Sequence, residues 1–173
     1  LDTLTAAFGA WLQGQGCKKG SRVALMMPNI LQYPVCLFGA LRAGCTVVNV
    51  NPLYTARELQ HQLNDSGAEV LVVVENFAKT VSEVVGTTKV RQVVVTSIGE
   101  LLGVKGIVVD LVLRRVKKMI PAFSLPGSIR LRDALAAARR SVDDQIDVMR
   151  TMAWLGRRER ARLWLAYVHG SSH

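Results

Sequence analysis

Short apolar runs, rich in β-branched residues, alternate with helical segments up to about residue 96, and this alternation restricts the fold more than any other feature. The runs lie at 23–27, 46–50, 70–74 and 93–96. Such runs, each bounded by turn residues, are typical of strands buried on both faces of a sheet. Because parallel strands are joined by long crossovers that are usually helical, the pattern predicts an α/β fold: a mostly parallel sheet flanked by helices.

The intervals between these runs carry helix signals. Apolar residues recur at helical spacing from Leu4 to Leu12, with Thr3 as the expected N-cap. A second helix is expected to begin near residues 33–34, because Pro is tolerated in a first turn, and to close at Gly44.

Two further helices follow. Thr55 and Glu58 have the spacing of a capping box, so a third helix is expected to run to about Ser66, with Gly67 just beyond its end. A fourth is expected at 77–85. The length of the chain is typical of one domain with a single core, which these helices and strands would form.

The positive charge of the chain is concentrated in its second part. The net charge is +9, with 8 Lys and Arg against 6 Asp and Glu in residues 1–99, and 14 against 7 in residues 100–173. A basic region can face anionic lipid, nucleic acid or an acidic partner, and charge alone does not choose among them. No aromatic array or recognition motif accompanies the charge, so no nucleic-acid partner is expected.

The residue types that usually carry catalysis or bind metals are scattered. Cys17, Cys36 and Cys45 lack C-x-x-C spacing and have apolar neighbours, which is typical of reduced thiols rather than of disulfides or zinc ligands. His61 has no second ligand at metal-binding spacing. We therefore expect no catalytic, cofactor-binding or metal-binding residue. Since no long uncharged apolar stretch and no leader pattern are found, we also expect no transmembrane helix, no signal peptide and a cytoplasmic location.

One segment carries a family resemblance. Residues 41–59, LRAGCTVVNVNPLYTAREL, place a Gly-closed helix, a buried strand, a Pro-containing turn and a capped helix in succession. The segment resembles the second core motif of AMP-forming adenylate ligases, most closely bacterial long-chain fatty-acid–CoA ligases. The residues that carry this structural motif are Gly44, Asn51, Pro52, Tyr54 and Glu58, and supporting matches are found at 28–29, 32–34 and 63–68.

The resemblance implies an incomplete N-terminal subdomain of the adenylate-forming ligase fold. It implies a parent enzyme that activates a long-chain fatty acid with ATP and Mg²⁺ to an acyl-adenylate, then transfers the acyl group to coenzyme A. The family's phosphate loop, ribose-binding Asp and C-terminal lysine have no counterpart in this sequence. The chain alone is therefore expected to be inactive and to bind none of these cofactors tightly.

The resemblance covers residues 1–140, as a partial N-terminal AMP-binding domain, and ends near Arg140. Residues 141–173 match no motif of the family, and they are interpreted as a divergent C-terminal tail, either a basic helix or an out-of-frame or unrelated terminus. The final residues, 170–173, resemble an expression remnant, so neither His169 nor His173 is given a role.

A basic amphipathic stretch precedes that tail. On a helix, Asp110, Arg114, Lys117 and Lys118 share one face, and Asp110 is positioned to pair with Arg114 four residues on. The stretch is either a helix that packs its apolar side on the sheet, or an interfacial helix on the inner face of a membrane. The candidate membrane-contacting residues are Val112, Arg114, Arg115, Val116, Lys117, Lys118, Met119 and Ile120.

Two functions from different classes therefore remain. The first is a fragment of a long-chain fatty-acid–CoA ligase, with peripheral membrane association implied by its sparingly soluble substrate. The alternative is a non-catalytic α/β module that binds membrane or protein through the basic helix.

Overall fold

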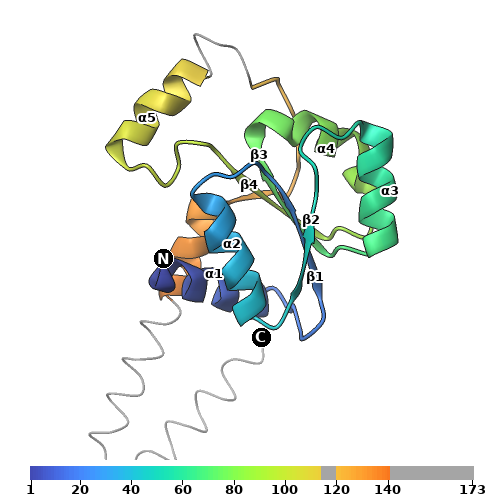
Figure 1. Ribbon diagram of the computed structural model, residues 1–173, viewed down its shortest axis with the longest axis horizontal. Coiled ribbons are helices and arrows are strands. Elements are labelled where there is room, and N and C mark those ends of the chain that lie inside the picture. Colours follow the sequence, from blue (N-terminus) through green and yellow to red (C-terminus); the bar gives the residue numbers. More distant parts are fainter. Residues whose placement is uncertain (114–119, 141–173) are drawn as a thin grey trace, which may run out of the picture. The chain divides into compact units, whose positions relative to one another are not determined.

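The computed structural model describes residues 1–113 and 120–140, and the first compact unit of the chain, Leu1–Ala136, contains the sheet and its helices (Figure 1). In chain order the elements are α1 (Asp2–Gly14), β1 (Arg22–Met26), α2 (Gln32–Arg42), β2 (Thr46–Asn49), α3 (Ala56–Ser66), β3 (Val70–Val74), the 3₁₀ turn Glu75–Phe77, α4 (Ala78–Val84), the 3₁₀ turn Val85–Thr87, β4 (Gln92–Thr96), α5 (Val104–Leu111) and β5 (Ile129–Arg130). Residues 131–140 are helical.

The sheet is parallel throughout the described residues, with strand order β2-β1-β3-β4-β5. The chain steps outward from β1 to β2 and then returns to β3 on the other side, so the order of the strands reverses between β1 and β3. In open parallel sheets, ligands bind outside the carboxyl ends of the strands near such a reversal.

The predicted α/β fold with a mostly parallel sheet flanked by helices is confirmed.

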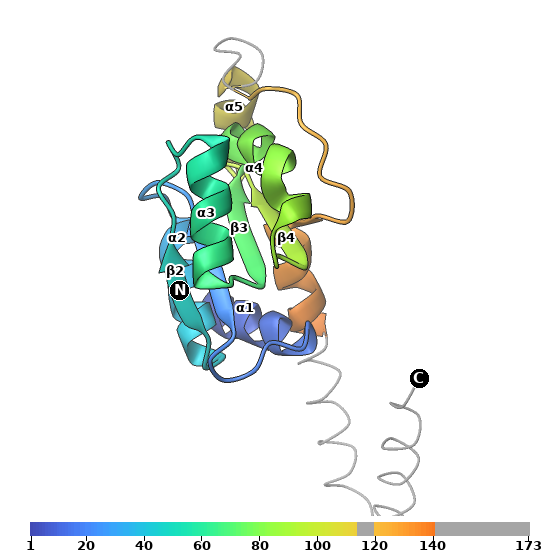
Figure 2. The same ribbon diagram turned by 90° about the vertical axis from the view of Figure 1, so that its right-hand side faces the viewer.

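Helices cover both faces of the sheet: α1 and α2 lie on one face, and α3 and α4 on the other (Figures 1 and 2). The central strand β3 is buried at every position, because its alternating side chains enter both layers. On the α3 side, Leu59 and Leu63 of the helix pack with Leu71 and Val73 of that strand. The edge strand β2 is only partly buried, which corrects the expectation of burial on both faces there.

Several predicted helix ends are present in the structure. The Thr55 side chain accepts a hydrogen bond from the Glu58 backbone N–H, and the Glu58 carboxylate accepts one from the Thr55 N–H at 2.8 Å, which completes the capping box. This backbone hydrogen bond, with that from the Thr55 hydroxyl, lowers the pKa of Glu58. Gly67 ends α3 in the left-handed conformation at φ +61°.

Other predictions were incomplete. The prediction of Thr3 as N-cap is wrong, because the first helix begins at Asp2. The hydroxyl of Thr5, within the helix, donates a hydrogen bond to the Asp2 carbonyl oxygen. Strand β5 and the helix at 131–140 were not predicted. A two-residue strand has too little periodicity to be seen in a sequence, and it exists because β4 supplies its backbone partners.

The two helices on one face approach each other closely through glycines. A Cβ added at Gly39 of α2 would lie 2.8 Å from Cδ1 of Phe8 and 3.0 Å from the Thr5 carbonyl oxygen. Phe8 is fully buried at this crossing and stacks on Trp11, with ring centroids 5.8 Å apart. Gly39 is therefore required by backbone proximity rather than by backbone conformation.

Candidate functional site

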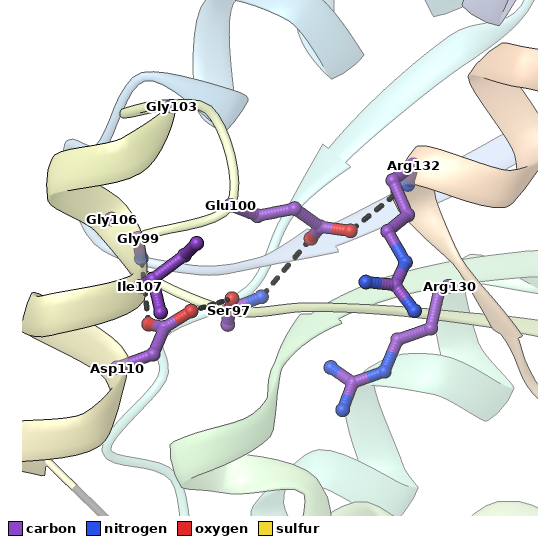
Figure 3. A pocket seen from close by; sticks show the side chains of 9 residues that line it. All are labelled: Ser97, Gly99, Glu100, Gly103, Gly106, Ile107, Asp110, Arg130 and Arg132. Carbon is purple, nitrogen blue, oxygen red and sulfur yellow. Dashed lines mark hydrogen bonds between the residues drawn. The ribbon is translucent and has the colours of Figure 1, made fainter.

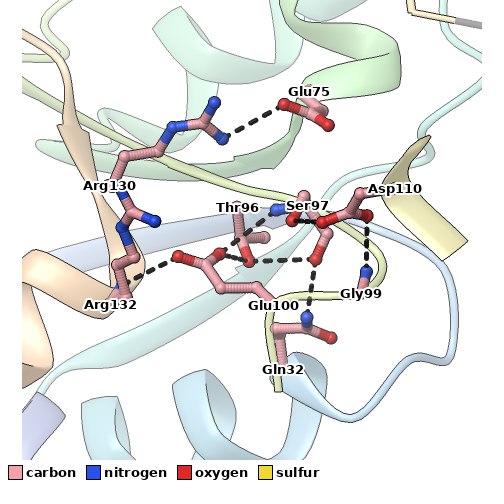
Figure 4. A network of polar contacts seen from close by, with 9 residues as sticks. All are labelled: Gln32, Glu75, Thr96, Ser97, Gly99, Glu100, Asp110, Arg130 and Arg132. Atoms are coloured by element: carbon pink, nitrogen blue, oxygen red, sulfur yellow. Dashed lines mark hydrogen bonds and ion pairs between the residues drawn. The ribbon is translucent and has the colours of Figure 1, made fainter. Parts of the chain in front are cut away.

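Polar side chains gather at the carboxyl ends of β3, β4 and β5 (Figure 4). This carboxyl-edge cluster consists of Gln32, Glu75, Thr96, Ser97, Gly99, Glu100, Asp110, Arg130 and Arg132. Thr96 ends β4 and Arg130 ends β5, whereas Glu75 directly follows β3. Parallel strands bring these ends to one edge of the sheet, although the residues are far apart in sequence.

The Glu100 carboxylate joins two segments of the cluster. One oxygen accepts hydrogen bonds from the Thr96 hydroxyl and from the Ser97 N–H at 3.1 Å. The other accepts the Arg132 N–H at 3.0 Å, in the first turn of the helix at 131–140. A carboxylate there satisfies an otherwise unbonded N–H and interacts favourably with the helix dipole. Glu100 thus fixes the loop after β4 against the start of that helix.

The Asp110 carboxylate holds α5 to the same loop. Its two oxygens accept the Ser97 hydroxyl at 2.6 Å and the Gly99 N–H at 2.9 Å. Gly99 and Gly106 of α5 lie so close that a Cβ on either would collide with the backbone of the other. The polar side of α5 therefore faces the protein at this point, and the close approach requires glycine on both segments.

A buried ion pair closes the cluster on its other side. Arg130 Nη1 lies 3.1 Å from Oε2 of Glu75, whose side chain is only 1% exposed. The side chain of Gln32 is fully buried and donates from Nε2 to the Ser97 carbonyl oxygen at 2.7 Å. The ion pair joins the end of β3 to β5, and the Gln32 hydrogen bond joins α2 to the loop that follows β4.

The cluster encloses a small cavity of about 210 Å³, lined by the two arginines, Glu100, Asp110 and Ser97 (Figure 3). Ligand pockets usually measure about 300 to 1,000 Å³, so the cavity is too small for a nucleotide. The Ser97 hydroxyl bonds to a carboxylate rather than to a histidine, and the described part of the chain holds no group of three or more potential metal-ligating residues. The lining of this cavity therefore offers no room for a nucleotide, and among the described residues it holds no three-residue set of metal ligands.

The residues of the predicted core motif shape the turns before and after β2 and the start of α3. Gly44 adopts φ +78° and Asn51 Oδ1 accepts the Leu53 N–H at 3.0 Å, so both shape turns around β2. Pro52 lies in the second of these turns. Tyr54 packs against the core, and Glu58 completes the capping box. None of these residues belongs to the carboxyl-edge cluster.

The predicted membrane-contacting residues fall mostly outside the described residues: Arg114, Arg115, Val116, Lys117, Lys118 and Met119. Among those described, Val112 is 37% exposed and Ile120 is partly buried. In α5, Ile107 and Val108 are 70% and 61% exposed, so these two apolar side chains do not pack on the sheet. No helix in the described ranges is long and apolar enough to cross a membrane.

Sequence reasoning did not find the carboxyl-edge cluster, and it interpreted Asp110 as a surface partner of Arg114. A signal was nevertheless present, because Glu75 and Thr96-Ser97 are polar residues that directly follow or end buried apolar runs. In a parallel sheet such positions meet at one edge. Arg130 and Arg132 carried no comparable signal, because β5 itself was not predicted.

Known proteins resemble this chain in sequence and in fold. The profile of the family described as AMP-binding enzyme matches residues 1–110. A long-chain-fatty-acid–CoA ligase from Escherichia coli is 57% identical over 137 residues, which is 78% of this chain and 24% of that protein. The corresponding ligase from Yersinia pestis is 52% identical over 153 residues, or 87% of this chain and 27% of that protein. The chain thus spans about a quarter of the length of these relatives.

Two solved structures of acyl-CoA-forming enzymes superpose on part of this chain. A long-chain-fatty-acid-CoA ligase from Archaeoglobus fulgidus superposes with a TM-score of 0.52 at 33% identity, covering 53% of this chain and 18% of that one. An acetoacetyl-CoA synthetase from Streptomyces lividans, at 20% identity, supports the fold alone, with a TM-score of 0.58 over 78% of this chain and 19% of that one. The sequence match over residues 1–110 and the parallel sheet together show that the chain belongs to the AMP-binding enzyme family.

Proposed function

We propose that this chain is a scaffold portion of an AMP-forming long-chain fatty-acid–CoA ligase and has no ligase activity alone. The observation that carries the proposal is the 57% identity over 137 residues with the Escherichia coli ligase. The parent reaction joins a fatty-acid carboxylate to AMP, with release of pyrophosphate from ATP, and then transfers the acyl group to the thiol of coenzyme A. Family enzymes use ATP, Mg²⁺ and coenzyme A for these steps.

The contribution of this part of the chain is structural. Glu100, Asp110 and the Glu75–Arg130 pair fix the loops at the carboxyl edge of the sheet, where α/β enzymes place their ligands. An apolar depression of about 510 Å³, which includes Ile30 and Ile98 in its lining, opens at the same edge. This edge is the surface that the remainder of a ligase would cover, and residues 1–140 form its partial N-terminal domain.

A segment exchange tests the proposal. Residues 1–140 would replace the matching segment of the Escherichia coli ligase, and palmitate-dependent acyl-CoA formation would be measured. We expect the chimera to retain kcat/KM within about tenfold of the parent, equal to about 1.4 kcal/mol of transition-state free energy. The 173-residue chain alone is the matched control, for which we expect no turnover above background.

Two outcomes would contradict the proposal. One is a chimera that has the parent's circular dichroism spectrum and melting temperature but forms no palmitoyl-CoA. The other is turnover by the 173-residue chain alone, which would place the ATP-handling groups within it.

We propose further that the stretch from α5 to Ile120 contacts an anionic membrane surface, where the parent would collect its sparingly soluble substrate. The exposed Ile107, Val108 and Leu111 of α5 support this contact, because apolar side chains turned away from the protein can enter the acyl boundary. The cations Arg114, Arg115, Lys117 and Lys118 follow directly in sequence. Each cation near an anionic surface contributes about 1 kcal/mol.

Co-sedimentation with phosphatidylglycerol–phosphatidylethanolamine vesicles checks this contact. Reversing two charges, Lys117→Glu with Lys118→Glu, is expected to weaken binding by at least about tenfold, since about 1 kcal/mol is lost per cation. Ile107→Asn is expected to weaken it as well. Leu53→Asn is the matched control, because Leu53 is 80% exposed on a different segment and should bind vesicles as the wild type does. Equal binding by all variants would refute the contact.

A further inference from the structure

Two cysteines that lie far apart in sequence meet in the fold. Cys17 lies in the loop after α1, Cys45 directly precedes β2, and each is 5% exposed. Each thiol is close enough to the other to influence its pKa. Both are free cysteines, and their separation in sequence gave no sign that they are neighbours.

The backbone around the two thiols holds them together. The Gly20 N–H donates to the Gly44 carbonyl oxygen at 2.9 Å, beside Cys45. A Cβ placed on Gly44 would be 3.5 Å from the Cα of Lys19. The loop that carries Cys17 and the turn that carries Cys45 are therefore in direct contact.

A cation is fixed beside one of the two sulfurs. Arg91 Nη2 lies 3.4 Å from Sγ of Cys17, and Nη1 donates to the Gln15 carbonyl oxygen at 2.5 Å. The same guanidinium lies 3.5 Å from the carboxylate of Glu69, between Nε and Oε2. Arg91 is thus held from two sides, and its charge is available to stabilise a thiolate on Cys17.

The two thiols are not equivalent. Burial raises the pKa of the Cys17 thiol, but the positive charge of Arg91 opposes the rise, and nearby Glu69 adds to it. Burial, followed by the influence of Cys17 and Glu69, raises the pKa of Cys45 to about 11, with no cation to oppose it. The proximity of the two thiols lowers the pKa of Cys17 and raises that of Cys45. Cys17 is therefore the first of the two to ionise.

We propose that Cys17 and Cys45 form an oxidisable dithiol site that closes to an intramolecular disulfide on reaction with hydrogen peroxide. The Cys17 thiolate attacks one peroxide oxygen, the O–O bond breaks, and the products are a sulfenic acid and hydroxide. The Cys45 sulfur then attacks Sγ of Cys17 and displaces the sulfenic oxygen as hydroxide. In total, two thiols and one hydrogen peroxide give one disulfide and two waters: sulfur is oxidised and the peroxide oxygens are reduced.

The tryptic map of this chain makes the site directly testable. Each cysteine lies in a separate peptide: Cys17 in 1–18, Cys45 in 43–57 and Cys36 in 23–42. The folded 173-residue chain would be treated with hydrogen peroxide, alkylated, digested without reduction and analysed by mass spectrometry. We expect the linked pair 1–18 with 43–57, two hydrogens lighter than its parts, and an unlinked 23–42. A link involving 23–42, disulfide-joined dimers, or over-oxidised but unlinked Cys17 would each overturn the proposal.

Variants separate the site from a general loss of structure. Cys36→Ser should leave the link intact, whereas Cys17→Ser and Cys45→Ser should abolish it. Arg91→Gln should slow oxidation several-fold and Arg91→Lys should restore part of the rate, because the cation favours the thiolate. Wild type in concentrated urea is the unfolded reference and should give mixed pairings; the same mixture without urea would contradict the proposal.

The rate of linking should also rise with pH. Arg91 and Glu69 are the charged groups that face Cys17, and the pKa of its thiol is raised, so the thiolate fraction is small near neutrality and grows as the solution becomes more alkaline. Oxidation at about pH 9 should therefore be faster than at about pH 7, since the thiolate is the reacting species. A rate that does not change with pH would contradict attack by Cys17.

Discussion

Arg130→Met is expected to lower the free energy of unfolding by about 2 kcal/mol, the usual contribution of a hydrogen bond to a charged group. Arg130 Nη1 lies 3.1 Å from Glu75 Oε2, and the Glu75 side chain is 1% exposed whereas that of Arg130 is 34% exposed. Removal of the cation takes a charge-assisted hydrogen bond away from a buried carboxylate, which is costly in a low-dielectric interior. Urea unfolding of the 173-residue chain, followed by circular dichroism, measures the change.

A second arginine of the cluster provides the matched control. Arg132 pairs through Nε with Asp133 at 3.4 Å, but the two side chains are 72% and 62% exposed. Exposed ion pairs contribute about 0 to 1 kcal/mol, so Arg132→Met should lower the free energy of unfolding by less than about 1 kcal/mol. Adding Glu75→Gln to Arg130→Met should recover part of the lost free energy of unfolding, because the buried negative charge is then removed. Equal effects of the two arginine substitutions would show that burial of the Glu75 carboxylate is not what matters.

Gly39→Val is the second substitution with a large expected effect, a loss of about 3 kcal/mol at the upper end of the usual cost of overpacking. The added Cβ would lie 2.8 Å from Phe8 Cδ1 and 3.0 Å from the Thr5 carbonyl oxygen. The Phe8 ring is fully buried and the carbonyl belongs to the backbone of α1, so neither can move without separating α1 from α2. The unfolding midpoint in urea and the melting temperature should both fall.

Gly14→Val is the matched control, because it adds the same side chain at a position where no neighbouring atoms are close. Gly14 is the last residue of α1, and a Cβ there would meet nothing within 4 Å. We expect its effect to stay within about 0.5 kcal/mol, as for most surface substitutions. If Gly14→Val were as destabilising as Gly39→Val, backbone proximity between the helices would not be the cause.

Much of the local structure was predictable because its causes lie within a few residues. The capping box of Thr55 and Glu58, the left-handed Gly67 and the strand Val70–Val74 each depend on neighbours in sequence. The alternation of such elements was enough to predict a parallel sheet covered by helices. The resemblance around residues 41–59 pointed to the family that the sequence comparison then showed.

The candidate site was less predictable because its residues come from separate segments. Glu75, Glu100 and Arg130 meet only after β3, β4 and β5 have aligned. The orientation of α5 was left open by the sequence for a related reason. Its periodicity allowed an apolar face either on the sheet or on a membrane, whereas in the structure Asp110 hydrogen-bonds to the loop after β4, and the glycines at 99 and 106 bring the two backbones together.

The amino-acid sequence by itself therefore determined the elements, their order along the chain and the class of sheet they form, because propensity, capping and hydrophobic period act over one or two turns. Only the tertiary structure decided which polar groups share the carboxyl edge, which face α5 exposes, and that Cys17 and Cys45 touch. Those contacts join residues tens of positions apart, and strand order and helix crossing, rather than any local preference, set the distances between them.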